Sequence, residues 1–415
     1  MKRLILLFAF AMIVIQLYSQ ETESDVDTLR KDALNVFMEA SDYIKKEIPY
    51  INYVRDRKVA DVYIISTSES TGSGGTVSTF FIVGQGKYSG MADTIKCNIS
   101  PDDTPDIKRS KEVKALKMGL IRYIAKTPLA QYMNISFTEP LSETVSSDKW
   151  NSWVYAANLW AYISGQSTYK INYLSGMLSA NRITEKSKFE SSISLDTETD
   201  KIKYQEEDFD TTYISTYKQK SGYLSYVKSI NNHWSAGGSI NVLSFTYSNY
   251  DLSINIAPGI EYDLFPYTES TRRLLTFLYK AGVEINNYTE ETDRFKMKET
   301  VAYHSLAAHM SYIQKWGSIS GTLTWSNYFF DWSYNKLRLY TTTRLRLFKG
   351  VQFNIQGQVS LVHDQISLPR EGASLEDVLL RRKMQRTTYQ YYTSIGLTYT
   401  FGSIYNNVVN PRFNN

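Results

Sequence analysis

The chain has 415 residues, enough for two domains or for one large sheet. Its 46 Lys and Arg against 42 Asp and Glu give a formal net charge of +4, which is too small a bias to indicate a nucleic-acid partner. The 33 Tyr and 18 Phe favour strands, although the mean hydropathy is only −0.34. A polar mean does not exclude a membrane, because a transmembrane barrel is apolar on only one face of each strand.

Residues 1–20 are predicted to be a signal peptide. Lys2 and Arg3 form a charged start, and the apolar run over residues 4–17 is too short for a comfortable bilayer span. Cleavage near Ser19 or Gln20 would remove two positive charges, so the balance becomes 44 − 42, or +2. No later apolar run is long enough for a transmembrane helix, so the mature chain is either soluble in the periplasm or crosses a membrane as strands.

Residues 21–128 predict a small α/β domain. A helix is expected first, from apolar residues at helical spacing, namely Val26, Leu29, Ala33, Val36, Phe37 and Ala40. Strands are expected next, over 50–54, 61–67, 77–83 and 92–99, with a Gly-rich hairpin loop at 68–75. A second helix is expected with Thr104 as its N-cap, Pro105 at its first position, and a buried stripe of Val113, Leu116, Leu120 and Ile124.

Residues 129–149 contain Pro140 and have mixed polarity, so they predict a linker. Cys97 is the only cysteine, which excludes an internal disulfide and a metal cluster built on cysteines.

Residues 150–415 alternate in polarity with period two over stretches of about ten residues, which predicts strands with one lipid face and one lumen face. In the clearest stretch, 351–361, apolar residues alternate with Gln, Asn and Ser. Strand starts are expected near Trp150, Tyr169, Ser187, Tyr213, Trp234, Leu252, Arg273, Glu299, Gly317, Leu337, Val351 and Tyr389. The pattern predicts a mainly β fold, a transmembrane antiparallel β-barrel of about twelve strands, preceded by the small α/β (α+β) periplasmic domain.

The predicted connections alternate in length. Short ones fall at 231–233, 315–317 and 349–350, and long charged ones at 196–212, 288–298 and 365–388. Short periplasmic turns and long extracellular loops are typical of outer-membrane barrels, so both termini are expected in the periplasm. Aromatic residues near strand ends predict interfacial girdles, and they include Trp150, Trp153, Trp234, Trp316, Trp332 and Tyr334. The alternative is a soluble β-sandwich with an aromatic core.

Two segments carry a resemblance to known proteins. The last strand ends in Gly-Leu-Thr-Tyr-Thr-Phe at 396–401, which resembles the C-terminal signal of outer-membrane barrels, although a tail follows it. Residues 47–57 (EIPYINYVRDR) and 60–62 (ADV) resemble the N-terminal segment of porin-like or uncharacterised outer-membrane proteins of the Bacteroidota type. The resemblance implies a location in the outer membrane and no catalytic residue. In element order, the small domain also resembles periplasmic domains such as the N-terminal part of TolB.

Several polar motifs favour structural roles over chemistry. The Gly-rich segment 71–75 lacks the Lys-Ser or Lys-Thr of a phosphate-binding loop. Asp102 and Asp103, near Asp106, could bind a hard cation, but they lie just ahead of a helix, where negative charge complements the dipole. His304 and His309 lie five apart on one strand and so point to opposite faces. His363 with Asp364 could be half of a hydrolase site. We predict no catalytic, cofactor-binding or metal-binding residue.

Charged residues at alternating strand positions are the candidate lumen-lining set. They are Arg338, Arg344, Arg346, Glu261, Asp263, Lys280 and Glu284. Buried charges must be paired or solvated, so this set predicts either a water-filled pore or a lumen plugged by ion pairs or by a loop. About twelve strands enclose a narrow lumen, which excludes large solutes.

The sequence therefore predicts a narrow porin-like channel for small solutes in the outer membrane, with membrane lipid around it. The alternative is a barrel that anchors an envelope assembly, secretion or scaffold protein, whose domain at 21–128 binds a periplasmic protein partner. An outer-membrane hydrolase is a third possibility.

Overall fold

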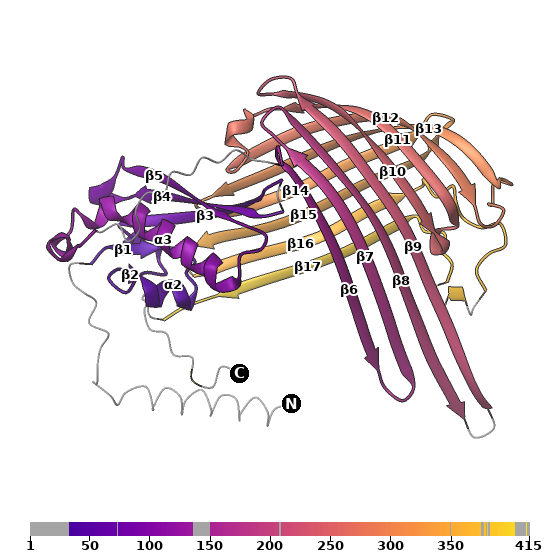
Figure 1. Cartoon of the computed structure of the whole chain (residues 1–415), viewed down its shortest axis with the longest axis horizontal. Helices are drawn as coiled ribbons and strands as arrows, with labels where there is room; N and C mark the ends of the chain where they lie inside the picture. Colours follow the sequence, from indigo (N-terminus) through magenta and orange to yellow (C-terminus); the bar gives the residue numbers. More distant parts are fainter. Residues whose placement is uncertain are drawn as a thin grey trace.

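The computed structural model contains a small sheet with its helices and a much larger curved sheet (Figure 1). It describes residues 33–72, 74–135, 150–206, 209–348, 350–374, 377, 378, 380, 382–402 and 412. The predicted signal peptide at 1–20 lies outside these residues, as does most of the predicted linker.

The small sheet has five strands in the order β2-β1-β3-β4-β5. They are β1 Asn35–Phe37, β2 Asn52–Tyr53, β3 Val62–Ser70, β4 Thr76–Gly84 and β5 Ala92–Ile99. β1 is parallel to β2 and β3, and the other pairs are antiparallel. The mixed α/β character predicted for this part of the chain is roughly what the structure contains.

Helix α3, Pro105–Ile124, covers this sheet and begins as predicted. Thr104 is its N-cap, and the Thr104 hydroxyl accepts a hydrogen bond from the Ile107 amide. Val113, Leu116, Leu120 and Ile124 are all buried, as the spacing predicted. Gly119 lets the helix approach β4 closely, because a Cβ there would lie 2.2 Å from the Ile82 side chain.

The predicted first helix is wrong where the structure describes it. Val36 and Phe37 lie in strand β1, and the short helix α2, Asp42–Glu47, begins after them with Ser41 as its N-cap. Val26 and Leu29, the start of the predicted helix, lie outside the described residues. Val36 is fully buried between β2 and β3, so pairing within the sheet overrides the local helical spacing. The 3₁₀ segments in this region are η1 Arg57–Val59, η2 Gly86–Tyr88 and η3 Pro128–Tyr132, the last of which overlaps the start of the predicted linker.

The large sheet has twelve antiparallel strands, paired in sequence order from β6 to β17. They are β6 Trp153–Gly165, β7 Tyr169–Ile183, β8 Ser187–Glu206, β9 Phe209–Ser229, β10 Trp234–Phe245, β11 Tyr250–Asp263, β12 Arg273–Tyr288, β13 Lys298–Gln314, β14 Gly317–Tyr328, β15 Asp331–Phe348, β16 Val351–Val362 and β17 Tyr389–Tyr399. The predicted number of strands and their antiparallel order are confirmed. The short segments η4 Thr246–Ser248 and η5 Tyr267–Glu269 lie in two of the connections.

Two expectations about this sheet differ from the structure. The barrel is not closed, since no pairing joins the described residues of β6 and β17. The segment 196–212 is not a loop, because β8 and β9 stay paired as far as Glu206 and Phe209. Its acidic residues indicated a loop, but they alternate with Thr197 and Thr199, and this period of two suits a strand that projects beyond the rest of the sheet.

The two faces of the large sheet differ in polarity. Cross-strand neighbours from β12 to β17 form an apolar row of Tyr279, Leu306, Trp325, Leu337, Leu361 and Tyr389. A row on the opposite face consists of Thr276, His309, Thr322, Tyr340, Gln358 and Tyr392. We call the second face the inner face, because the connection between β16 and β17 packs on it through Ile366. The apolar outer face carries most of the exposed large side chains of the sheet.

Four of the tryptophans predicted to lie near strand ends do so. Trp153 and Trp234 begin β6 and β10, Trp316 lies in the β13–β14 turn, and Trp332 follows the first residue of β15. Tyr334 differs from them, because it packs towards Ile366 rather than forming part of an outer girdle.

Candidate functional site

All seven candidate lumen residues lie on the inner face. Glu261 and Asp263 are on β11, Lys280 and Glu284 on β12, and the three arginines on β15. The register places Glu284 opposite Asn255 and Arg344 opposite Asn354, each pair on the polar side of its strands. The register shows that these residues share a face. That they line a closed lumen stays a prediction.

The structure does not bring the arginines together with the acids. β13 and β14 separate β12 from β15, so these two strands are about 14 Å apart at about 4.8 Å per strand. Within the described residues, no ion pair joins Arg338, Arg344 or Arg346 to an acid of β11 or β12. The partner of Arg346 is Glu39 of the small domain, at 2.6 Å.

Glu284 is held by hydrogen bonds along the inner face. Asn255 Nδ2 donates to its carboxylate at 3.2 Å, and the Tyr328 hydroxyl donates at 3.0 Å. The Tyr303 hydroxyl then donates to Asn255 Oδ1 at 3.0 Å. This network joins the neighbouring strands β11 to β14 along the inner face. On the same face, the Lys280 ammonium donates to the Ser239 hydroxyl at 3.3 Å.

The connection at 363–388 crosses the end of the sheet remote from the small domain, which we call the far end (Figure 1). Ile366 is fully buried against Val301 and Tyr328. Further along, the Leu380 carbonyl accepts hydrogen bonds from the Ser215 and Tyr217 hydroxyls of β9. The segment therefore runs across the inner side from β16 to β9, and we call it the cover loop.

Ion pairs hold the cover loop against the connection between β12 and β13. Three basic residues of the cover loop pair with three acids of that connection, in the pairs Arg370–Glu291 at 2.8 Å, Lys383–Glu290 at 2.8 Å and Arg386–Asp293.

Asn249 joins three connections at the far end. Its amide donates to the carbonyls of Glu290 and Ser367, both at 2.9 Å, and its Oδ1 accepts from the Glu290 amide at 2.8 Å. Asn249 has a left-handed backbone (φ 62°), which asparagine tolerates better than most residues. A single side chain thus holds the β10–β11 turn, the β12–β13 connection and the cover loop together.

The small domain lies at the opposite end of the sheet, the near end (Figure 1). It approaches the near end of the sheet at four places. Arg346 stacks on Phe37 at 4.7 Å, Lys315 on Tyr63 at 4.5 Å and Arg272 on Phe81 at 5.5 Å. The tip of the β3–β4 hairpin also approaches Ile183, where a Cβ on Gly72 would lie 2.6 Å away. These contacts reach from the β7–β8 turn to the end of β15, so the small domain spans the near end.

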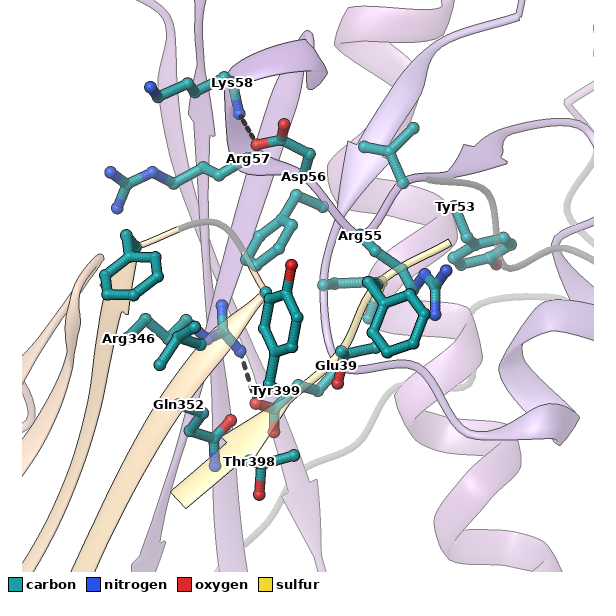
Figure 2. Close-up of a pocket in the computed structure, with 18 of the residues that line it drawn as sticks. Glu39, Tyr53, Arg55, Asp56, Arg57, Lys58, Arg346, Gln352, Thr398 and Tyr399 are labelled. Atoms are coloured by element: carbon teal, nitrogen blue, oxygen red, sulfur yellow. Dashed lines mark hydrogen bonds and ion pairs between the residues drawn. The ribbon is translucent and has the colours of Figure 1, made fainter. Parts of the chain in front are cut away.

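A cavity of about 1280 Å³ lies between the small domain and the ends of β15, β16 and β17. Figure 2 shows Arg55, Arg57 and Lys58 from the small domain, with Arg346 and Tyr399 from the sheet. Six cations line the cavity against two carboxylates, those of Glu39 and Asp56. The six cations are those of Lys45, Arg55, Arg57, Lys58, Lys315 and Arg346.

Two of the acids near the start of α3 form ion pairs with basic residues of that helix. Asp103 pairs with Lys111 at 2.5 Å, and this hydrogen bond lowers the pKa of Asp103. Asp106 pairs with Arg109 on the first turn of α3.

The histidines of the large sheet differ in environment. His309 contacts the Thr322 hydroxyl on the inner face, whereas His304 is buried among the aromatic rings of Trp325, Phe329 and Trp332 on the opposite face. His363 follows β16, and its neighbour Asp364 pairs with Lys336 at 3.5 Å. Among the described residues, no group of three or more His, Cys, Asp or Glu is placed to hold a metal ion.

Sequence reasoning missed the near-end cavity. It predicted a long charged connection at 365–388 and a loop that plugs the lumen as one alternative, but it did not predict the ion pairs that hold the cover loop. A signal for these ion pairs was present, because the acidic run at 290–293 is matched by the basic run at 381–386. The cavity had no such signal, since residues near 37–58 and near 346–401 meet only through the fold.

Comparison with known proteins adds little. No family model and no curated protein matches the chain. A structure described as the NanC porin in a rhombohedral crystal form is similar at 9% identity, over 60% of this chain and 99% of that one, with a TM-score of 0.29. This likeness is too distant to support an argument about function. No helix in the described part of the chain is both long and apolar enough to cross a membrane.

Proposed function

We propose that this chain is an outer-membrane β-barrel protein that forms a narrow conduit for small polar solutes. The observation that carries the proposal is the polarity of the twelve-stranded sheet, with apolar rings and Leu on the outer face and amides, hydroxyls and charges on the inner face. A sheet of this kind suits lipid on one side and water on the other.

Placing this sheet in a membrane also favours its closure into a barrel. β6 and β17 present unpaired backbone groups, and such edges are unfavourable in a hydrocarbon layer because nothing there replaces the missing hydrogen bonds. With an even number of alternating strands, the first and last run antiparallel, so their pairing closes the barrel. The near end, where the small domain lies, would face the periplasm.

The conduit is covered at both ends, by the small domain and by the cover loop. We therefore expect rare or small conductance steps until the cover loop is released. Arg338 and Arg344 would bias the conduit towards anions, because their guanidinium groups stay charged at any working pH.

The test is planar-bilayer recording of the mature chain. In a variant carrying Glu290→Gln, Glu291→Gln and Asp293→Asn, the loop loses its three charge pairs and the fraction of time in the open state should rise at least tenfold. A matched control, Asp42→Asn with Glu47→Gln and Asp102→Asn, removes three exposed acids from the small domain and should behave as wild type.

Selectivity provides an independent measurement. Arg338→Gln with Arg344→Gln should lower the anion-to-cation permeability ratio, whereas Lys96→Gln with Lys108→Gln on the small domain should not. Silent bilayers for wild type and for all variants would refute the conduit.

A second candidate function is that of an envelope scaffold acting through the small domain. It is favoured by the span of that domain across the near end, from Ile183 to Arg346. Silent bilayers in which hydrogen exchange shows a folded small domain would favour this function over the conduit.

A further inference from the structure

We propose that the near-end cavity binds the headgroup of an anionic phospholipid from the surrounding membrane. The inference rests on the membrane placement proposed above and does not require that the barrel conducts.

The first support is an excess of positive charge. Arg55, Arg57 and Lys58 follow one another closely after β2, and among the described residues no carboxylate lies within ion-pair distance of their side chains. Of the two lining acids, Glu39 is already paired with Arg346. Asp56 accepts a hydrogen bond from the Lys58 backbone amide at 3.0 Å. Arginine and lysine are the side chains that bind phosphate oxygens.

The second support is the apolar border on the sheet side. Phe348, Tyr399 and Phe401 line the cavity, yet they are 69%, 63% and 75% exposed. Tyr399 and Phe401 stack at 5.4 Å, at the near end of the last strand. Aromatic rings in this position are typical of the level of lipid headgroups. A ligand seated here would meet cations on one side and apolar rings on the other.

The third support is size. A cavity of about 1280 Å³ exceeds the range of roughly 300–1,000 Å³ that is usual for small-molecule sites. A free inorganic ion would fill a small fraction of it. A phospholipid headgroup with the first part of its acyl chains matches both the volume and the two-sided lining, and basic residues beside a membrane attract anionic lipids.

The test is lipid titration of the detergent-solubilised full chain by native mass spectrometry. The probes are phosphatidylglycerol, phosphatidylcholine and inorganic phosphate. The wild-type chain should bind phosphatidylglycerol at least tenfold more tightly than phosphatidylcholine. The variant Arg55→Gln, Arg57→Gln, Lys58→Gln should lose at least tenfold in affinity for phosphatidylglycerol.

A control removes the same charge from the same domain. The control variant is Lys96→Gln, Lys108→Gln, Lys114→Gln. None of these three lysines lines the cavity, so this variant should bind phosphatidylglycerol within twofold of wild type. Equal losses in the two triple variants would show nonspecific attraction and overturn the proposal. Tight binding of inorganic phosphate that displaces the lipid would assign the site to the free anion and would also overturn it. Either failure leaves bilayer conductance unaffected, so it is distinguishable from failure of the conduit.

Discussion

The small domain and the large sheet bury opposite kinds of residue. In the small domain, Val36, Ile82, Leu116 and Leu120 are fully buried in one apolar core. In the large sheet, buried side chains are often polar, including Ser215, Ser225, Ser239, Asn286, Asn327 and Ser360, while most of its large apolar side chains are exposed. The first arrangement is stabilised by removing apolar surface from water. The second leaves a large apolar surface exposed, as expected of a protein whose outer solvent is lipid.

The strongest test of the comparison is a cavity in the apolar core. Leu116→Ala should lower the free energy of opening of the small domain by about 2–5 kcal/mol, because its site is fully enclosed. Ile107→Ala, at an exposed position of the same helix, should cost far less. Hydrogen exchange of α3 amides in the full chain gives both values. Equal costs would mean that the domain is not stabilised by this core.

The corresponding test on the sheet uses charge. Leu339→Arg, on the outer face of β15, should destabilise the protein in a bilayer by about 2–4 kcal/mol, the cost of arginine near the membrane midplane. Gln356→Arg, on the inner face of β16, should have little effect because water or polar groups surround it. Denaturant unfolding from lipid vesicles measures both. If Gln356→Arg proves the more costly, the two faces have been assigned the wrong way round.

Sequence reasoning predicted some elements of the two regions and missed others. Period-two alternation predicted the strands well at 351–362, because each residue type matches the solvent on its own side. The capping residues Thr104 and Pro105 located α3 for an equally local reason. Val36 and Phe37 were assigned to a helix, because their burial depends on strands that come later in the chain.

The candidate site shows the same division. The sequence placed Arg346 among the polar residues of a strand, which the register agrees with. It could not supply Glu39 as the partner, since 307 positions separate the two residues. Contacts between distant segments follow from the docking of one region on the other, and local periodicity carries no information about docking.

A smaller effect concerns alkaline pH. Burial raises the pKa of Tyr123 to about 12, from 10.0 in the unfolded chain, and the Tyr123 hydroxyl donates to the Ile82 carbonyl at 3.2 Å. A raised pKa gives stability that is complete below pH 10 and is lost as the pH rises towards 12. At pH 11 this one group should cost the small domain about 1 kcal/mol.

Tyr123→Phe removes that ionisation, so it should flatten the fall in stability between pH 10 and 12, even though it starts from a less stable domain. Hydrogen exchange of α3 with the rate corrected for pH is the measurement. An unchanged slope would show that the hydroxyl is already exposed to water.

The central claim is that the twelve-stranded sheet spans a membrane with its polar face towards water. It is tested most directly by single cysteines placed one by one along β16, from 352 to 361, in outer-membrane vesicles treated with a membrane-impermeant thiol reagent. The native Cys97 is buried and burial raises the pKa of its thiol, so its background reaction should be slow. We predict that positions 352, 354, 356 and 358 react while 353, 355, 359 and 361 are protected by lipid. Labelling without this period of two would contradict the account.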